Sequence, residues 1–354
     1  MGKKVNIGVI GAGSIGSVHT EAYGRIADVA NVVALCDILP DKLAEKAKRH
    51  SIGKTYTDYH DLLADPEIEA VSVCVPNCVH APIAIDALKA GKHVMLEKPM
   101  SLSAKLAQDI VDARDASGKI LQVGMVRRQE NEVAIVKKMI DDGRLGEVYQ
   151  IRVKLIRRRG IPGLGGWFTT KAQSGGGAVI DISVHALDLS LYATGLWQPT
   201  AVSAKTYSKF GNPISDYHFV DMWAGPPRPE GTFDVDDYAA GLIRFGDKAT
   251  LSFEVAWACN AQPENCIEIL GDKGGVRLGG SDIVLATEFD NRPADIKIDY
   301  DRKNDGFAKE LKLFCGAING ENDVPATGEQ GVVLMKILDA IYQSSAENRE
   351  ITLA

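Results

Sequence analysis

Short apolar runs alternate with amphipathic segments along the first third of the chain. The apolar runs have the length and β-branched content of buried strands, and they occupy Val5–Ile10, Val32–Cys36, Ala70–Val75, His93–Leu96 and Ile120–Val123, with a shorter candidate at Thr55-Tyr56. The segments between them favour helices, at about Ile15–Ala27, Asp41–His50, Asp61–Leu63, Ala81–Ala90 and Ala104–Ser117. This alternation predicts βαβ units around a parallel sheet, whose strands are buried on both faces and therefore apolar throughout.

The pattern changes after Gly124. One more helix is predicted over Val133–Asp142, and segments of alternating polarity then follow at Val148–Arg158, Ala201–Ser208, Tyr238–Phe245, Thr250–Trp257, Glu264–Leu270 and Gly275–Leu278. Such alternation, broken by turns, is typical of a mostly antiparallel sheet. A final helix over Gly331–Ser345 carries apolar residues at helical spacing.

Charge and cysteine content narrow the class of protein. The chain has 354 residues, with 40 Lys and Arg against 47 Asp and Glu, and a formal net charge of −7. This charge weighs against binding to nucleic acid or to an anionic membrane, because both depend on basic residues. No apolar run reaches the ~18 residues of a membrane span. The cysteines form no C-x-x-C pair, so we expect free thiols, no metal site and a cytoplasmic location; they are Cys36, Cys74, Cys78, Cys259, Cys266 and Cys315.

A glycine motif directly follows the first predicted strand. Gly11-Ala12-Gly13-Ser14-Ile15-Gly16 fits G-x-G-x-x-G and opens a predicted helix. In a dinucleotide site Gly11 permits the tight turn, Gly13 lets the backbone approach the pyrophosphate, and Gly16 allows close helix–strand packing. The motif predicts a Rossmann domain over residues 1–124 that binds NAD, with Ser14 and Ile15 at the helix N-terminus that receives the anion.

Asp37 stands at the end of the second predicted strand, the position of the carboxylate that binds an adenosine ribose. A carboxylate there would repel a 2′-phosphate, and Ile38 follows it in place of a basic residue. We therefore expect NAD rather than NADP as the cofactor. The alternative is a glycine turn followed by a helix-capping aspartate.

Three further polar clusters stand at the ends of predicted strands or beside a glycine run. They are Val75–His80, which contains Pro76 and Asn77; Glu97-Lys98-Pro99; and Gly175–His185, which contains Asp181. Ligands of open α/β sheets gather at the carboxyl ends of the strands. The first two clusters are therefore expected to line the same crevice as the glycine motif, and Arg127, after the strand Ile120–Val123, is a candidate to border the nicotinamide.

Together these motifs resemble the Gfo/Idh/MocA oxidoreductases, the family of glucose–fructose oxidoreductase and inositol dehydrogenase. The resemblance runs nearly end to end and also includes Val123–Arg128 and the strand that begins at Asp236-Asp237-Tyr238. It implies an α/β Rossmann domain followed, over residues 125–354, by an α+β domain built on a large open sheet. The last helix of this second domain, 331–345, is a candidate to pack back on the Rossmann domain. It also implies a nicotinamide cofactor, a sugar or polyol substrate, and a homodimer or homotetramer.

The resemblance also implies roles for individual residues. Lys98, Asp181 and His185 would meet at the nicotinamide and bind the substrate, and the Lys98–Pro99 bond would be cis. Contacts with the cofactor are implied for Pro76, Asn77, His80, Glu97 and Trp167.

The chemistry of these residue types is consistent with oxidation of an alcohol. Imidazole suits a general base because its ordinary pKa is near 6.5. Asp181 and His185 are four residues apart and would share one face of a helix, where Asp181 could hold a hydroxyl or orient the imidazole. Lys98 would supply positive charge where an alkoxide develops.

Purely structural roles remain possible for the same residues. His185 could be a buried helix histidine, Asp181 and His80 could be helix caps, and Lys98 could be a solvated surface lysine. Trp167 and Phe168 could be core. The run Arg157–Arg159 suits a solvated face or an oligomer contact, although Arg157 could also bind substrate through its planar donors.

Three functions are compatible with this pattern. The first is an NAD-dependent dehydrogenase of a sugar or cyclitol. The second keeps the same site but uses oxidation transiently, so that a glycosidic substituent is eliminated without net production of NADH. The third is a non-catalytic, nucleotide-gated sugar sensor, which would not need Lys98 and His185.

Overall fold

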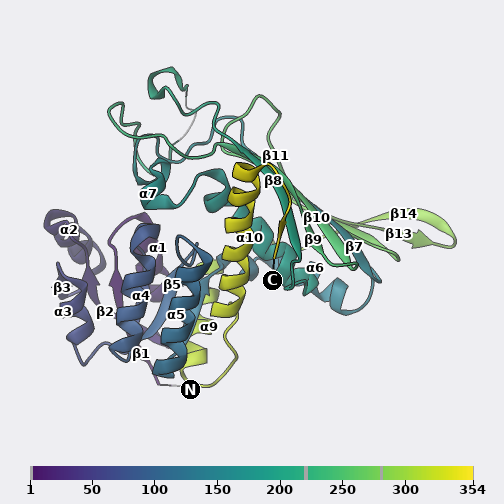
Figure 1. Cartoon of the computed structure of the whole chain (residues 1–354). Coiled ribbons are helices and arrows are strands. Elements are labelled where there is room, and N and C mark those ends of the chain that lie inside the picture. The colour runs from purple at the N-terminus through teal and green to yellow at the C-terminus, as the bar shows by residue number, and fades with distance from the viewer. Residues whose placement is uncertain (1–2, 219–221, 280–281, 354) are drawn as a thin grey trace. The chain divides into compact units, whose positions relative to one another are not determined.

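The computed structural model describes residues 3–218, 222–279 and 282–353. Contacts divide the chain into two compact units (Figure 1). The first unit comprises residues up to Gln129 together with Asp305–Met335, and the second comprises Glu130–Asn304 and the residues from Lys336 onward. The sequence predicts a boundary at residue 124, with all later residues in the second domain. In the structure, Asp305–Met335 belongs to the first unit instead.

The first unit is built on a six-stranded parallel sheet with strand order β3-β2-β1-β4-β5-β6, which is the Rossmann order. The strands are β1 (Val5–Ile10), β2 (Ala30–Cys36), β3 (Lys54–Tyr56), β4 (Ala70–Val73), β5 (His93–Glu97) and β6 (Leu121–Gly124). The connecting helices are α1 (Ser14–Arg25), α2 (Pro40–His50), α3 (Tyr59–Ala64), α4 (His80–Lys89) and α5 (Ala104–Ser117). The expected alternation and parallel sheet are confirmed.

Helix α9 (Gly306–Ile318) completes the core of the first unit and was not among the helices predicted from the sequence. Its buried Leu311 and Phe314 join the same apolar cluster as Val5, Tyr23 and Leu35. The side chain of Asp305 caps the helix by accepting the N–H of Ala308 at 3.2 Å. Because the cluster is shared, α9 is a structural part of the nucleotide-binding unit.

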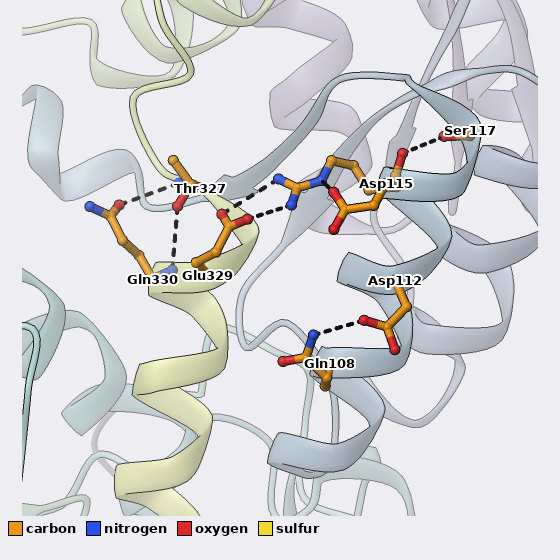
Figure 2. Close-up of polar contacts among 8 residues, drawn as sticks. Gln108, Asp112, Asp115, Ser117, Thr327, Glu329 and Gln330 are labelled. Carbon is orange, nitrogen blue, oxygen red and sulfur yellow. Dashed lines mark hydrogen bonds and ion pairs between the residues drawn. The ribbon is translucent and has the colours of Figure 1, made fainter. Parts of the chain in front are cut away.

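Helix α10 (Gly328–Glu347) contains the predicted helix 331–345 and begins beside Val111 of α5. Thr327 and Gln330 form a reciprocal cap at its start, in which each backbone N–H is donated to the other residue's side chain at 3.4 and 3.3 Å. Glu329 in the first turn pairs with Arg114 of α5, which also binds its neighbour Asp115 (Figure 2). These contacts fix the first turns of α10 to the first unit.

The second unit contains a nine-stranded sheet of order β14-β13-β12-β11-β7-β10-β9-β8-β15. Its strands are β7 (Val148–Ile156), β8 (Ala201–Tyr207), β9 (Tyr238–Phe245), β10 (Ala249–Ala256), β11 (Glu264–Gly271), β12 (Gly275–Leu278), β13 (Ile283–Phe289), β14 (Arg292–Ile298) and β15 (Ile351–Thr352). Neighbouring strands run antiparallel except β7 and β10, which confirms a mostly antiparallel sheet. Strands β13 and β14 were not predicted, because most of their residues are not buried and show little alternation.

The second unit also contains helices α6 (Asn131–Asp141) and α8 (Val184–Thr194). Across the described residues, no helix combines the length and apolarity needed to cross a bilayer. All six cysteines are free thiols, as expected.

The pair between Glu329 and Arg114 makes stability depend on pH. The hydrogen bond from Arg114 lowers the pKa of Glu329 from 4.5 to about 2. A carboxyl with a lowered pKa stabilises the fold above its unfolded pKa, and this contribution is lost as the pH falls from about 4.5 toward about 2. Both side chains are partly exposed, so screening limits the contribution to about 1 kcal/mol.

Glu329→Gln should therefore lower the free energy of unfolding by up to about 1 kcal/mol at pH 7. The difference from wild type should shrink below about pH 4.5, as measured by urea unfolding between pH 7 and pH 3. Gln108→Ala, which removes a bond within α5 to Asp112 (Figure 2), is the control and should show no such trend. A Glu329→Gln difference that stays constant with pH would contradict the assignment.

Candidate functional site

The glycine motif forms the tight turn between β1 and α1. Gly11 has a φ of 98°, and a Cβ there would lie 2.2 Å from the carbonyl oxygen of Cys74. A Cβ on Gly16 would lie 1.8 Å from the carbonyl oxygen of Gly11. Gly13 is the N-cap of α1 and supplies no side-chain cap, so the first N–H groups of the helix, from Ser14 and Ile15 onward, have no side-chain cap partner. This is the geometry that a pyrophosphate requires.

Asp37 is tied to the same turn. Its Oδ2 accepts the backbone N–H of Ala12 at 2.8 Å, and its Oδ1 accepts that of Leu39 at 3.0 Å. The Lys42 ammonium lies 3.9 Å from Oδ2. The carboxylate therefore holds the glycine turn in addition to presenting a negative charge beside it, and the side chain of Ile38 next to it is 82% exposed.

The cluster after β4 forms a short 3₁₀ turn, η1 (Asn77–Val79), which Pro76 precedes and α4 continues. Asn77 is buried. The buried His80 ring lies with Nδ1 2.8 Å from the carbonyl oxygen of Pro99 and Nε2 2.9 Å from that of Val75. Since its ring binds carbonyl groups and none of the N–H groups of α4, the alternative that His80 is a helix cap is wrong.

Glu97 is the last residue of β5, and Lys98 follows it at the carboxyl edge of the sheet. The Lys98–Pro99 bond is cis, as expected. The buried Glu97 carboxylate lies 2.8 Å from Nε2 of His19, a fully buried histidine of α1, and accepts the backbone N–H of Lys98 at 3.2 Å. Burial acts to raise the pKa of Glu97, but the bond from His19 and the charge of Lys98 hold it below its usual value.

Arg127 and Arg128 lie in the 3₁₀ turn η2 (Val126–Gln129) after β6. Arg128 is buried and donates to the carbonyl of Pro325 at 2.6 Å and to the side chain of Gln330 at 2.7 Å. It therefore fixes the segment that leads into α10. Arg127 is half-buried beside it.

In the second unit, the glycine run 175–177 leads into a π-helical turn, η4 (Val179–Ser183), which passes directly into α8. Asp181 lies in this turn and His185 lies one turn later in α8, so the segment is helical as expected but more widely wound at Asp181. Asp181 is buried, and its Oδ2 accepts the indole N–H of Trp257 at 3.0 Å. The N-cap of this segment is Ala178, three residues before Asp181, and it has no side-chain capping bond, so the capping alternative for Asp181 is wrong.

Asp236 anchors the start of that helical segment. Its carboxylate accepts the backbone N–H groups of Gly177 and Val179, each at 2.8 Å, and the hydroxyl of Tyr342 at 2.7 Å. Burial raises the pKa of Asp236, and these three donors oppose that effect. A Cβ at position 177 would lie 1.8 Å from the Asp236 carbonyl oxygen, which explains the glycine.

The remaining candidates of the second unit have local partners. Trp167, in the 3₁₀ turn η3 (Trp167–Thr169), stacks on Phe168 with centroids 3.8 Å apart, and both rings are half-buried. Arg157 is exposed, and its guanidinium folds back to within 3.5 Å of the Gly160 carbonyl oxygen. Arg159 donates to the carbonyl of Cys259 at 2.9 Å, so the third arginine of the run joins two segments of its own unit.

The sequence-predicted residues therefore fall into two groups. The glycine turn, Asp37, the residues around Asn77 and Lys98, and Arg127 belong to the first unit, whereas Trp167, Arg157, Asp181 and His185 belong to the second. Two supporting residues, His19 and Trp257, were not predicted, although they contact Glu97 and Asp181. Nothing local in the sequence marks these two residues, because their partners lie 78 and 76 residues away.

A parallel sheet of Rossmann order with a glycine turn between β1 and α1 is the architecture of a dinucleotide-binding protein. Residues 5–125 match the model of the oxidoreductase family with an NAD-binding Rossmann fold, and residues 133–277 match that of the GFO/IDH/MocA C-terminal domain. The chain belongs to the Gfo/Idh/MocA oxidoreductase family, which confirms the resemblance.

Similar proteins include sugar and cyclitol dehydrogenases. The chain is 28% identical to the D-glucoside 3-dehydrogenase of Escherichia coli, over 99% of this chain and 97% of that protein. It is 26% identical to the myo-inositol 2-dehydrogenase of Thermotoga maritima, over 99% and 98%. The structure of a levoglucosan dehydrogenase in complex with NADH superposes with a TM-score of 0.87 at 25% identity and covers 99% of this chain and 100% of that one.

Gly177→Ala tests the role of the close approach to Asp236. The added methyl would meet backbone atoms, so we expect a loss of about 1–3 kcal/mol in the free energy of unfolding. Gly24→Ala, in the last turn of α1 with no atom within 4 Å of the new Cβ, should instead be neutral or stabilise by up to about 1 kcal/mol. If Gly177→Ala and Gly24→Ala have the same free energy of unfolding in urea, the close contact with the Asp236 carbonyl oxygen does not constrain position 177.

Proposed function

We propose that the protein is an NAD-dependent dehydrogenase that oxidises a secondary alcohol of a sugar, cyclitol or related polyol. The observation that carries the proposal is the position of Lys98. It follows β5 at the same carboxyl edge of the parallel sheet at which β1 opens into the glycine turn. An ammonium group beside a dinucleotide site is suited to polarise a substrate oxygen.

The residues of the second unit supply the complementary groups in this proposal. Asp181 is held by Trp257 and by a helical turn that Asp236 anchors, so its carboxylate has a fixed direction. His185 lies one turn further along the same segment. We propose that Lys98, Asp181 and His185 meet at the substrate, and that the half-buried Trp167 and Arg127 border the nicotinamide.

Bound NAD would supply the hydride acceptor, and the chain's own residues would handle the proton and the charge. His185 takes the proton of the reacting hydroxyl, Asp181 accepts a hydrogen bond from a substrate hydroxyl, and Lys98 stabilises the negative charge that develops on the oxygen. Asn77, Pro76 and the glycine turn hold the cofactor. Glu97 and His80 already bind groups of the protein, so in this proposal they hold the residues next to Lys98 in place.

We propose NAD over NADP because of Asp37. Its carboxylate is fixed beside the glycine turn by the N–H of Ala12, where it can accept ribose hydroxyls and repel a 2′-phosphate.

The substrate class is supported by the relatives, which act on a D-glucoside, levoglucosan and inositols according to their names. The experiment is a screen of NADH formation across inositols, aldoses, glycosides and anhydrosugars. An aglycone released without net NADH would instead favour transient oxidation with elimination. A homodimer or homotetramer is also proposed from the family resemblance, and light scattering of the purified protein would test it.

Lys98→Ala should lower kcat about 100- to 10,000-fold on the substrate found in that screen, because it removes the charge that stabilises the developing alkoxide. The Kd for NADH, measured by fluorescence titration, should change little. Lys105→Ala, at an exposed lysine of α5, is the control. Unchanged turnover in Lys98→Ala would remove this lysine from the mechanism.

Asp37→Ala should weaken NAD binding about tenfold or more, because a charge-assisted hydrogen bond to the ribose is lost. Discrimination against NADP should relax in the same variant. Asp37→Asn keeps an oxygen that can accept the N–H of Ala12, so it separates loss of charge from loosening of the turn. If both variants keep the wild-type ratio of the Kd values for NADH and NADPH, Asp37 does not face the ribose.

A further inference from the structure

Lys98 is bordered on each side by a buried histidine that its sequence motif does not include. Glu97, before it, is held by His19 of α1. Pro99, after it, is held by His80 of α4. Both rings are almost completely buried, with 0% and 1% exposure, although histidine usually keeps part of its ring in contact with water.

We propose that His19 and His80 are positioning residues for Lys98 that fix the backbone immediately before and after it. We call the group formed by His19, Glu97, Pro99 and His80 the Lys98 clamp. The inference rests on the proposed function, since it assigns the clamp to the lysine that this function uses. All of its members belong to the first unit.

The first half of the clamp is a buried ion pair. Burial would lower the pKa of His19, but Cys74 and the Glu97 carboxylate act in the opposite direction and hold it well above its usual value. Glu97 is the residue whose carboxylate His19 contacts directly, with Nε2 2.8 Å from Oε1. The other oxygen of that carboxylate accepts the backbone N–H of Lys98 at 3.2 Å, which links His19 to the lysine through one side chain.

Buried ion pairs are costly to break, because loss of one partner leaves an uncompensated charge out of contact with water. The pair therefore restricts Glu97 to one orientation. A Cβ on the neighbouring Gly124 would lie 3.0 Å from Glu97 Oε1, so the space around the carboxylate is also closed on the side of β6. The Glu97 carboxylate is therefore a fixed acceptor for the backbone N–H of Lys98.

The second half of the clamp joins two loops. Both nitrogens of His80 face carbonyl oxygens, which only accept hydrogen bonds, and a neutral imidazole has a single N–H to donate. Burial lowers the pKa of His80, whereas the carbonyls of Pro99 and Val75 raise it. The ring lies between the carbonyl oxygens of Val75 and Pro99 and is closed off from solvent, and the neutral ring donates its single N–H to one of the two.

Side chains of helices α1 and α4 therefore restrain the backbone on both sides of Lys98. Both helices start at the carboxyl edge of the sheet, where the glycine turn lies. A displacement of about 1 Å at a catalytic group can cost about 100-fold in rate. Removing either histidine should therefore affect the chemical step more than cofactor binding.

The test compares kcat with the Kd for NADH in four variants of the full chain. His19→Leu should lower kcat about 10- to 100-fold with the Kd for NADH nearly unchanged. His19→Gln places an amide donor near the position of Nε2 and should recover most of kcat. His80→Leu should behave as His19→Leu does, and His80→Asn, which can still donate to the Pro99 carbonyl, should recover part of kcat.

His93→Asn is the matched control. His93 stands at the opposite end of β5, where its Nδ1 accepts the backbone N–H of Ile120 at 3.0 Å, and an asparagine oxygen can replace that acceptor. This variant should keep wild-type kcat. If the leucine variants fail to fold, kcat of His80→Asn should still lie below that of His93→Asn, and equal kcat values for these two variants would contradict the proposal.

A second readout does not depend on catalysis. The rate at which trinitrobenzenesulfonate labels Lys98, followed by peptide mass spectrometry, should change several-fold in His19→Leu and His80→Leu relative to the label on the exposed Lys105. If the wild type oxidises no polyol, the proposed function fails. The labelling rates alone then test whether His19 and His80 position Lys98. Unchanged labelling of Lys98, or equal losses of kcat and NADH binding that the conservative variants do not reverse, would overturn the proposal.

Discussion

Carboxylates that accept backbone N–H groups hold the loops that carry the main candidate site residues. Asp37 does so at the glycine turn, Glu97 at Lys98, and Asp236 at the turn that carries Asp181. A fourth, Asp237, accepts three consecutive N–H groups, from Lys209, Phe210 and Gly211 at 2.7, 2.6 and 3.3 Å. Loops lack the repeated hydrogen bonds of helices and strands, so a fixed acceptor is what gives such a segment one conformation.

The cost of this arrangement is desolvation of the carboxylates. Burial raises the pKa of both Asp236 and Asp237, and their donors only partly oppose it. For Glu97 the balance is reversed, because the imidazolium of His19 and the Lys98 ammonium are added to the backbone donor. Of these three carboxylates, only Glu97 has its pKa held below the usual value, and it stands next to the lysine that the proposed reaction uses.

The local structure around the candidate cofactor-binding residues of the first unit could be predicted from the sequence, because its determinants are local. The turn Gly11–Gly16, Asp37 and Glu97-Lys98-Pro99 each lie at a strand end, and strand ends follow from apolar runs. The residues that support these motifs could not be predicted. His19 meets Glu97 across 78 residues, and α9 joins the first core from the far end of the chain, so neither leaves a periodic signal near its partner. The strands β13 and β14 were missed for a different reason, since β14 has no buried residue and β13 is buried only at Ile283 and Leu285, which leaves little alternation to detect.

The second unit explains why the substrate is harder to infer than the cofactor. Asp181 depends on Trp257, 76 residues later, and the start of its helical segment depends on Asp236 and through it on Tyr342, a further 106 residues along the chain. Each of these bonds joins elements that are adjacent only in the folded unit. A change at any one of them would alter the surroundings of Asp181 without altering the motif that contains it. The candidate residues of the first unit therefore lie in short local motifs, whereas Asp181 depends on contacts with residues that no local motif contains.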